Sequence, residues 1–415
     1  MEQVRLKRLV SRVNVKSQTP NLKSHIDLED IQSWTGKHSS HVGDVESDQT
    51  TFQPGDVLFG KLRPYLAKVV RPLSEGTCSS ELLVLRPGKN VETNFLFYAA
   101  IDKKFIDLVD SSTYGAKMPR ASWDFIGQIP IALPDFERQL TIALFLDRKT
   151  TQIDALIARK RRQIELLKEK RAALITRAVT KGLDPHVKMK DSGVEWLGEI
   201  PQSWDMFQIR RGLDLLTDYE ANGSFADTKA NVRVDGDDEY AWYVRATDLE
   251  KGRSGVDEQN RYCDKPSYNY LAKTKLYGGE LLITKRGEIG KCYIMPNIQG
   301  YATLAPNLYL LRLNHNLNPS FAFYWFRSEL GRSQLVLSNK STTIGALYKD
   351  DVKALRIPFP PRDEQDRIVQ DISKSIGRID DIILKINSSI VLLLEFRTSL
   401  ISEAVTGKLS IGQKL

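Results

Sequence analysis

Apolar residues follow a helical period over a long stretch in the first half of the chain. Gln139–Thr180 contains no proline or glycine. Its apolar side chains recur mostly three, four or seven positions apart, at Ile142, Leu146, Ile153, Leu156, Ile157, Ile164, Leu167, Leu174 and Ala178. This spacing predicts one long helix with a coiled-coil-like seam. Pro134 and Asp135 before the stretch and Gly182 after it are typical start and stop signals.

A second stretch near the end of the chain has the same pattern. Its stripe consists of Ile368, Ile372, Ile376, Ile379, Ile383, Ile386, Ile390, Leu393, Leu400 and Ala404, with Pro360 and Pro361 before it and Gly407 after it. A long helix cannot bury a single apolar stripe by itself. We therefore expect the two helices to pack against each other in antiparallel orientation.

The two helical stretches are copies at an offset of 226 residues. Gln139, Asp154, Arg171 and Thr180 recur as Gln365, Asp380, Arg397 and Thr406, together with most of the apolar positions between them. This period is far longer than the roughly 20–50 residues of a solenoid repeat. The repeated unit is therefore a whole domain with its connecting helix, and the chain is a tandem duplication.

Short runs rich in β-forming residues precede each helix and predict a globular head in each copy. The expected strands are 57–62, 81–85, 281–284, 291–295 and 308–313, and helices are expected at 94–108 and 319–337. The fold class is α+β: two mixed α/β heads separated by two long antiparallel helices, in a pseudo-two-fold tandem repeat. We place the domains at 1–134, 135–183, 184–360 and 361–415.

Length and composition agree with two domains in a water-soluble chain. The 415 residues exceed the roughly 250–300 over which a single core grows, and 41% hydrophobic residues are enough for two cores. There is no run of about 18 apolar residues and no apolar stretch typical of a signal peptide, so we expect a cytoplasmic protein without membrane contact. A net charge of +8 favours a polyanionic partner, although a merely basic surface would have the same charge.

The sequence carries no recognisable catalytic motif. The segment RGEIGK (286–291) lacks the first glycine and the hydroxyl residue of a P-loop, and neither a GxGxxG fingerprint after a strand nor a GxSxG elbow occurs. The Asn/Asp-Pro-Pro-aromatic motif of amino-methyltransferases is also missing. We expect this chain to perform no covalent chemistry and assign no catalytic residue.

Cysteine and histidine give no metal signature. Cys78, Cys263 and Cys292 are too scattered for a disulfide framework or a CxxC site. His38 and His41 lie in a polar loop in which we expect no acidic or thiol company. We assign no metal.

Both heads repeat a strand that ends in cations. Gly60, Lys61, Leu62 and Arg63 match Thr284, Lys285, Arg286 and Gly287, and the segment SSTYGAKMPR (111–120) matches KSTTIGALYK (340–349). Each motif by itself is compatible with an ordinary polar turn. Their recurrence indicates contact with phosphates or base edges. The candidate DNA-binding residues are Lys61, Arg63, Lys68, Tyr114, Lys117, Arg120, Arg245, Lys285, Arg286, Lys291, Thr342, Thr343 and Lys349.

The helices offer candidate partner contacts. The first carries a run of cations from Arg159 to Arg171 that is either a solvated face or a phosphate contact, whereas the second has Val391, Leu392 and Leu394, which indicate a further protein partner. As partner-binding positions we take Ile153, Ile164, Leu167, Leu174, Ile379, Ile390, Leu393 and Leu400.

Over essentially its full length the chain resembles the specificity subunit of type I restriction–modification systems. The matching segments are GDVLFGKLRPYLAKVV (55–70), DSGVEWLGEIPQSW (191–204) and the paired helix endings LLKEKRAALITRAVTKGL (166–183) and LLLEFRTSLISEAVTGKL (392–409). Members of that family carry two target-recognition domains separated by helical conserved regions. The resemblance implies that each head reads one half of a bipartite DNA target.

The resemblance also implies partners and assigns every cofactor to them. Two methyltransferase subunits would bring S-adenosylmethionine and methylate an adenine in each half-site, and restriction subunits, which are motor nucleases, would use ATP and magnesium. No cofactor is expected in this chain itself. The rival hypothesis is a non-catalytic coiled-coil scaffold with two protein-binding heads.

Two departures from the family pattern remain. The first head has no counterpart of GVEWLGEIPQSW, so its N-terminal strand is either unsupported or completed by the C-terminal tail. Residues 217–255, rich in Asp, Gly and Asn, read as an insertion or long loop of the second head.

Overall fold

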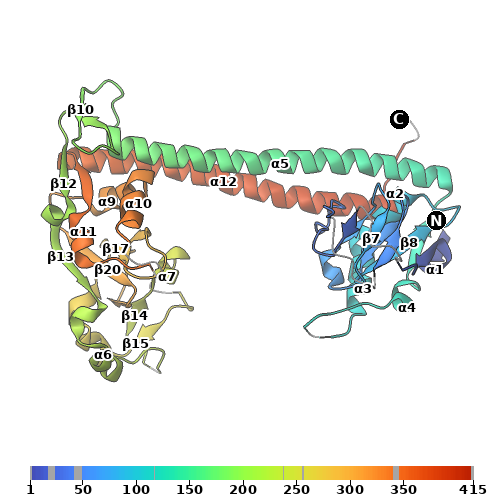
Figure 1. Ribbon diagram of the computed structural model, residues 1–415, viewed down its shortest axis with the longest axis horizontal. Coiled ribbons are helices and arrows are strands. Elements are labelled where there is room, and N and C mark those ends of the chain that lie inside the picture. The colour runs from blue at the N-terminus through green and yellow to red at the C-terminus, as the bar shows by residue number, and fades with distance from the viewer. Residues whose placement is uncertain are drawn as a thin grey trace. The chain divides into compact units, whose positions relative to one another are not determined.

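The computed structural model describes residues 2–16, 24–41, 49–115, 117–236, 238–254, 257–339 and 345–412. These residues form two compact units, residues 1–162 with 385–415 and residues 163–384. Each unit contains one head and a part of both long helices, α5 (Phe136–Lys181) and α12 (Arg362–Val405) (Figure 1). With 46 and 44 residues, α5 and α12 confirm the two predicted helices.

The ends of both helices follow the expected signals. The Asp135 carboxylate accepts a hydrogen bond from the backbone N–H of Arg138 (2.8 Å) at the start of α5. Gly182 (φ +74°) and Gly407 (φ +75°) adopt the left-handed conformation just after α5 and α12. Glycine adopts it at little cost, which ends a helix sharply.

Within each unit the two helices run antiparallel, and an ion pair joins them. In the first unit Arg397 Nε lies 3.1 Å from Asp154 Oδ1, and Arg138 near the start of α5 donates to the carbonyl of Ile411 after α12 (2.6 Å). In the second unit Arg171 Nη1 lies 2.9 Å from Asp380 Oδ1. The two pairs are repeat equivalents, because Asp154 and Asp380, and likewise Arg171 and Arg397, are 226 residues apart.

The head of the first unit contains two small sheets and a short ribbon. One sheet has the order β2-β8-β5-β6, the other β3-β7-β4, and β1 pairs with β9. The strands are β1 (Glu2–Arg5), β2 (Val10–Val13), β3 (His25–Ile26), β4 (Thr50–Phe52), β5 (Val57–Gly60), β6 (Val69–Val70), β7 (Gly76–Cys78), β8 (Leu82–Pro87) and β9 (Pro130–Leu133). The helices are α1 (Leu6–Leu9), α2 (Thr93–Ile101), α3 (Lys103–Ser111) and α4 (Trp123–Ile126).

The head of the second unit repeats this arrangement with additions. Its sheets are β13-β20-β17-β18 and β15-β14-β19-β16, with β12 paired to β21 and β10 to β11. The strands are β10 (Met189–Asp191), β11 (Glu199–Pro201), β12 (Asp205–Gln208), β13 (Leu213–Asp218), β14 (Ala241–Val244), β15 (Tyr262–Cys263), β16 (Lys275–Leu276), β17 (Leu281–Thr284), β18 (Cys292–Ile294), β19 (Tyr301–Leu304), β20 (Leu308–Leu313) and β21 (Arg356–Phe359). The helices are α6 (Phe225–Asn231), α7 (Ala246–Glu250), α8 (Lys265–Tyr270), α9 (Pro319–Arg327), α10 (Glu329–Leu337) and α11 (Lys349–Ala354).

A buried glutamine ties each long helix to its head. The Gln139 amide donates to the carbonyls of Asn90 (3.0 Å) and Pro134 (2.9 Å), and its oxygen accepts from the N–H of Glu92 (2.8 Å). In the second unit Gln365 makes the equivalent three bonds, to Asn316 O (2.9 Å), Pro360 O (2.9 Å) and Asn318 N (2.8 Å). Both side chains are at most 1% exposed, so the two amides satisfy backbone groups that water does not reach.

The core of the second unit joins the helix pair to the head. Ile175 and Val179 of α5 and Ile368 and Ile372 of α12 belong to one buried cluster with residues of α9, β17 and β20. Its largest side chains are Trp204, Phe321, Trp325 and Phe326, and Trp325 Nε1 donates to the carbonyl of Arg356 (3.0 Å). The end of the segment DSGVEWLGEIPQSW therefore serves packing, because Trp204 is fully buried within this cluster.

Several sequence expectations need correction. The helices expected at 94–108 and 319–337 are each two helices, broken at Asp102 and Ser328, where the backbone leaves the helical conformation. Ser328 caps the second piece by accepting from the N–H of Gly331 (3.2 Å). The five expected strands are confirmed within a few residues as β5, β8, β17, β18 and β20.

The 217–255 segment is not a loop. It contains α6, β14 and α7, because Ser224 and Asp227 form a capping box at α6 and β14 pairs in parallel with the buried strand β19. The N-terminal strand of the first head also has support, since β1 pairs with β9 over four residues rather than with the C-terminal tail.

The buried glutamine of the second unit leads to a stability prediction. Replacing Gln365 with alanine leaves two carbonyls and one N–H without partners, which should lower the free energy of unfolding by about 2–4 kcal/mol. Urea denaturation followed by tryptophan fluorescence measures this loss. Gln370→Ala, an exposed glutamine on the same helix, is the matched control and should change the midpoint little. Equal effects of the two substitutions would contradict the proposed clamp.

Candidate nucleic-acid interface

The two motifs that recur in the sequence meet in each head. After β5 in the first head, Lys61 O accepts from the N–H of Ala121 (3.0 Å), and Arg63 donates to Pro119 O (2.8 Å). After β17 in the second head, Lys285 O accepts from Leu347 (3.0 Å), and Gly287 donates to Gly345 O (3.0 Å). A strand end and a loop more than fifty residues away thus form one extended platform, by the same hydrogen bonds in both copies.

The platform of the first head presents exposed cations and an exposed aromatic ring. Arg63 is exposed, has a left-handed backbone (φ +51°) and directs a guanidinium N–H to Lys117 O (3.5 Å). Lys117 is also exposed, and Tyr114 is 65% exposed. Arg120, by contrast, is held by Glu81 (Nη2 to Oε1, 3.0 Å). The exposed side chains of Arg63, Tyr114 and Lys117 are therefore available to a ligand.

The remaining two candidates of the first head are less available. Lys61 is half-buried at the end of β5. Lys68 donates from Nζ to the carbonyl of Leu28 (2.7 Å), so its ammonium group supports the fold of the head.

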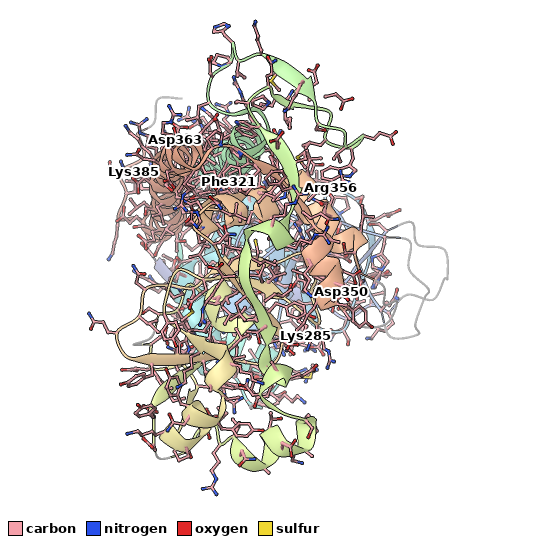
Figure 2. All side chains as sticks on the ribbon, turned by 90° about the vertical axis from the view of Figure 1, so that its left-hand side faces the viewer. Lys285, Phe321, Asp350, Arg356, Asp363 and Lys385 are labelled. Carbon is pink, nitrogen blue, oxygen red and sulfur yellow. The ribbon has the colours of Figure 1, made fainter. Side chains whose placement is uncertain are left out.

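The platform of the second head is built on a buried ionic cluster. Lys285, labelled in Figure 2, is 6% exposed. Its Nζ lies 2.5 Å from Asp218 Oδ2 and 2.8 Å from Glu220 Oε2. Lys349 Nζ lies 2.8 Å from Asp218 Oδ1. Burial alone would raise the pKa of Asp218, but the hydrogen bonds and charges of Lys285 and Lys349 outweigh it and hold that pKa below its ordinary value.

Most other predicted cations of the second head also have acidic partners. Arg245 Nη2 lies 2.6 Å from Asp248 Oδ1, and Lys291 Nζ lies 2.6 Å from Glu250 Oε1 and 2.5 Å from Glu288 Oε2. Arg286 is the exception in exposure, since its side chain is 59% exposed although it lies 3.3 Å from Glu220. Thr342 and Thr343 lie outside the described residues.

The structure adds candidates that sequence reasoning missed. Glu220 lines the platform of the second head between two hollows of about 700 and 450 Å³, and Arg286 lines both as well. Phe225, the first residue of α6, is 84% exposed at the larger hollow, and Tyr348, 58% exposed, lines the smaller one. In the sequence, the signal for this site was an aromatic residue, Phe225, in a polar stretch of the segment that we interpret above as an insertion or long loop.

The predicted partner-binding positions are covered by the chain itself. Ile153, Ile164, Ile379, Ile390 and Leu400 are buried, and Leu167, Leu174 and Leu393 are half-buried. The exposed apolar side chains of the helices are others, among them Leu166 (47% exposed), Val391 (54%), Leu392 (64%) and Phe396 (56%). The basic run of α5 is mostly exposed, except that Arg171 pairs with Asp380.

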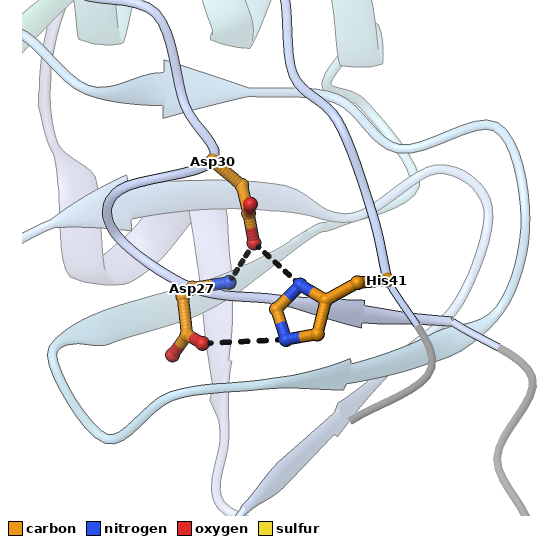
Figure 3. A group of neighbouring side chains, drawn as sticks. All are labelled: Asp27, Asp30 and His41. Atoms are coloured by element: carbon orange, nitrogen blue, oxygen red, sulfur yellow. Dashed lines mark hydrogen bonds and ion pairs between the residues drawn. The ribbon is translucent and has the colours of Figure 1, made fainter. Parts of the chain in front are cut away.

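One expectation about histidine was wrong. His41 has acidic company, because its Nδ1 lies 3.2 Å from Asp30 Oδ2 and its Nε2 lies 3.6 Å from Asp27 Oδ2 (Figure 3). The backbone bridge between His25 and His41 brings these two carboxylates, which follow β3, next to the imidazole. Asp30 also accepts from the N–H of Asp27 (2.8 Å), so the group closes a turn.

Two further findings concern membrane spans and the reactivity of the cysteines. In the described part of the chain no helix is long and apolar enough to span a bilayer. All three cysteines are buried free thiols, and burial raises the pKa of Cys263 to about 11 and of Cys78 and Cys292 to about 12. These thiols are therefore not activated nucleophiles.

The chain thus has two similar heads with recurrent strand-end platforms, each joined to a part of the same helix pair. A family model described as type I restriction modification DNA specificity domain matches residues 18–166 and 220–391, more than half of the chain. The chain belongs to this family.

Two curated relatives are described as specificity subunits of type I restriction enzymes, one of them as putative. The specificity subunit of the Escherichia coli type I restriction enzyme EcoDI is 28% identical over 114 residues, which is 26% of this chain and 25% of that protein. The putative type I restriction enzyme MjaX specificity subunit of Methanocaldococcus jannaschii is 24% identical over 216 residues, 51% of this chain and 47% of that protein. The aligned regions thus span a quarter to about half of those relatives.

Solved structures show the same fold over nearly the whole chain. One comes from a study of complex assembly and conformational transition of the type I restriction–modification system, with a TM-score of 0.72, 19% identity and coverage of 98% of both chains. Another is the HsdS subunit from Thermoanaerobacter tengcongensis, with a TM-score of 0.55, 19% identity and coverage of 98% of this chain and 97% of that one. At this identity the likeness establishes the fold.

The buried ionic cluster predicts an acid-dependent loss of stability. Asp218→Asn removes one partner of a buried pair and should lower the free energy of unfolding by about 3 kcal/mol at pH 7. Because the folded-state pKa lies below the unfolded one, this contribution is complete above about pH 4 and disappears as the pH falls through the folded value. Urea denaturation between pH 3 and 7 should show the wild-type and variant curves converging at low pH. The exposed Asp214 of the same strand supplies the control, Asp214→Asn; a gap independent of pH would refute the assignment.

Proposed function

We propose that this chain is the DNA sequence-recognition subunit of a type I restriction–modification complex and that each head reads one half of a bipartite target. The observation that carries this proposal is the platform that recurs in both heads. It presents Arg63, Tyr114 and Lys117 in the first and Arg286 with Tyr348 in the second. Cations and aromatic rings on extended backbone suit phosphates and base edges.

The two platforms favour contacts with different parts of the DNA because their charges differ. The first presents exposed Arg63 and Lys117, which suit phosphate contacts, whereas the cations of the second are balanced by Asp218, Glu220 and Glu250. A surface of alternating charges gains less from the phosphate backbone and more from matched donors and acceptors on bases. This difference supports two unlike half-sites.

We further propose that the helices dock two methyltransferase subunits, one for each copy of the repeat. Leu166 of α5 and Leu392 of α12 are repeat equivalents, and both are exposed. An exposed leucine kept at both equivalent positions suits two copies of one partner protein. In this assembly the methyltransferases supply S-adenosylmethionine and the chemistry, restriction subunits supply ATP- and magnesium-dependent cleavage, and this chain takes no part in bond making.

The docking proposal allows for an asymmetric addition on α12. Val391 and Phe396, both exposed, stand where α5 has Glu165 and Lys170. The same observation favours the alternative function, a scaffold with two protein-binding heads. Salt separates the two functions: binding to DNA through several phosphates should weaken steeply between about 50 and 200 mM salt, and a largely apolar protein interface should not.

The exposed arginines predict a loss of DNA affinity. In a complex reconstituted with its methyltransferase subunits, Arg63→Ala and Arg286→Ala should each weaken binding to the full target. A phosphate contact would be lost for every sequence alike, and a base contact would relax one position at a cost of about 1–3 kcal/mol. Fluorescence anisotropy with target and scrambled duplexes distinguishes the two cases. Lys103→Ala, on α3 and paired with Asp107, is the control; unchanged affinity in both arginine variants would exclude the platforms as the DNA contact.

The helices predict a change in half-site spacing. Four residues inserted after Ala158 add about 6 Å to α5 and rotate the later stripe by only about 40°. We expect the gap between the two half-sites to grow by about one or two base pairs, at about 3.4 Å each. A map of methylated adenines measures the gap. The same insertion after Gly193, in an exposed turn, is the control; an unchanged gap in the Ala158 variant would show that the helix does not set the spacing.

A further inference from the structure

The acidic side chain on the platform of the second head has a fixed position. Glu220 lies two residues after the end of β13 at Asp218. Its Oε2 lies 2.8 Å from Lys285 Nζ, and its Oε1 lies 3.3 Å from Arg286 Nη2. Lys285 is itself anchored by the buried Asp218. A chain of charges that starts in the core therefore orients this carboxylate.

The oriented carboxylate is also open to solvent. The side chain of Glu220 is 56% exposed, like that of Arg286 at 59%, and both residues line the two hollows described above. Lys285 and Arg286 engage part of the carboxylate, and the remaining lone pairs face solvent. The surface thus presents a hydrogen-bond acceptor beside a guanidinium donor.

The charge of Glu220 decides what it can meet on DNA. A carboxylate repels phosphate but accepts hydrogen bonds from the exocyclic amino groups of cytosine (N4) or adenine (N6), which are donors in the major groove. A neighbouring arginine is the usual partner of guanine O6 and N7. The Glu220–Arg286 pair therefore matches base edges better than it matches the backbone.

The first head lacks this acidic pair at the corresponding positions. Strand β2 pairs with β8 as β13 pairs with β20, so that Val13 opposite Val84 corresponds to Thr217 opposite Leu310. Continuing one and three residues along the chain, Asn14 corresponds to Asp218 and Lys16 to Glu220. At these aligned positions the carboxylates therefore occur only in the second head, as expected for a residue that gives one head its own specificity.

We propose that Glu220 is a specificity-determining residue of the second head and accepts a hydrogen bond from the amino group of a cytosine or adenine in its half-site, with Arg286 as the adjacent donor. This inference rests on the proposed function and adds to it a residue and the base chemistry that the residue reads. Phe225 and Tyr348, both exposed, line the same two hollows, one each.

The test is a binding selection from a random duplex library, performed with complexes that contain wild-type chain or Glu220→Ala, which removes the acceptor altogether, whereas glutamine would keep an acceptor oxygen that pairs with adenine. The variant should lose its preference for an amino-bearing base at one position of one half-site, with affinity for the wild-type target reduced about tenfold to a hundredfold. The other positions and the other half-site should be unchanged. Glu258→Ala, at an exposed glutamate of the same head, is the matched control and should keep the wild-type consensus.

A second arm leaves the protein unaltered and therefore does not depend on the folding of the variant. In the wild-type target, 2-pyrimidinone replaces each cytosine in turn and purine replaces each adenine, which removes one amino group at a time. One base substitution should weaken wild-type binding as much as Glu220→Ala does, and the two changes together should cost no more than either alone. The position that behaves in this way identifies the base.

The outcomes distinguish a failure of the role proposed for Glu220 from a failure of the proposed function of the chain. An unchanged consensus and affinity in Glu220→Ala, or an equal loss on every sequence, would overturn the role of Glu220, and so would wild-type binding that tolerates every amino deletion. If the wild-type complex selected no sequence at all, the proposed function would fail together with this inference.

Discussion

The structure depends on one constraint, which is that each long helix must cover the apolar stripe of the other. Within each unit a part of α5 and a part of α12 run antiparallel, and an ion pair joins them, Asp154 with Arg397 in one unit and Arg171 with Asp380 in the other. Duplication supplied both partners of both pairs. One copy of the repeat by itself would leave the apolar stripe of its long helix exposed. The helices of the two copies therefore pack together and share their cores.

The glutamine clamps extend this constraint from the helices to the heads. Gln139 and Gln365 each bind two backbone groups just before α2 or α9 and one just before their own helix, so the first turn of each helix is attached to its head by buried hydrogen bonds. The platform lies elsewhere in the head, on strand ends and loops that the clamp does not touch. This separation lets the platform residues diverge while the frame remains the same, which is what two different readings by one scaffold require.

The sequence predicted the frame better than the site for a physical reason. The stripes of α5 and α12, their end signals and the strand cores are local patterns of burial, and most were read correctly. The environment of Lys285 was not, because Asp218 and Glu220 lie more than sixty residues earlier in the chain and no spacing rule connects them. The segment around Phe225 failed likewise, since its helix depends on a capping box and on a neighbouring parallel strand pair rather than on apolar periodicity.

The most direct test of the account is a map of methylated adenines in cells that carry this chain with its methyltransferase subunits. The account predicts one motif made of two unlike blocks of specified bases, separated by a gap of constant length and unspecified sequence. Two identical blocks, a single block or a gap of variable length would contradict the claim that two different heads on one frame read the DNA.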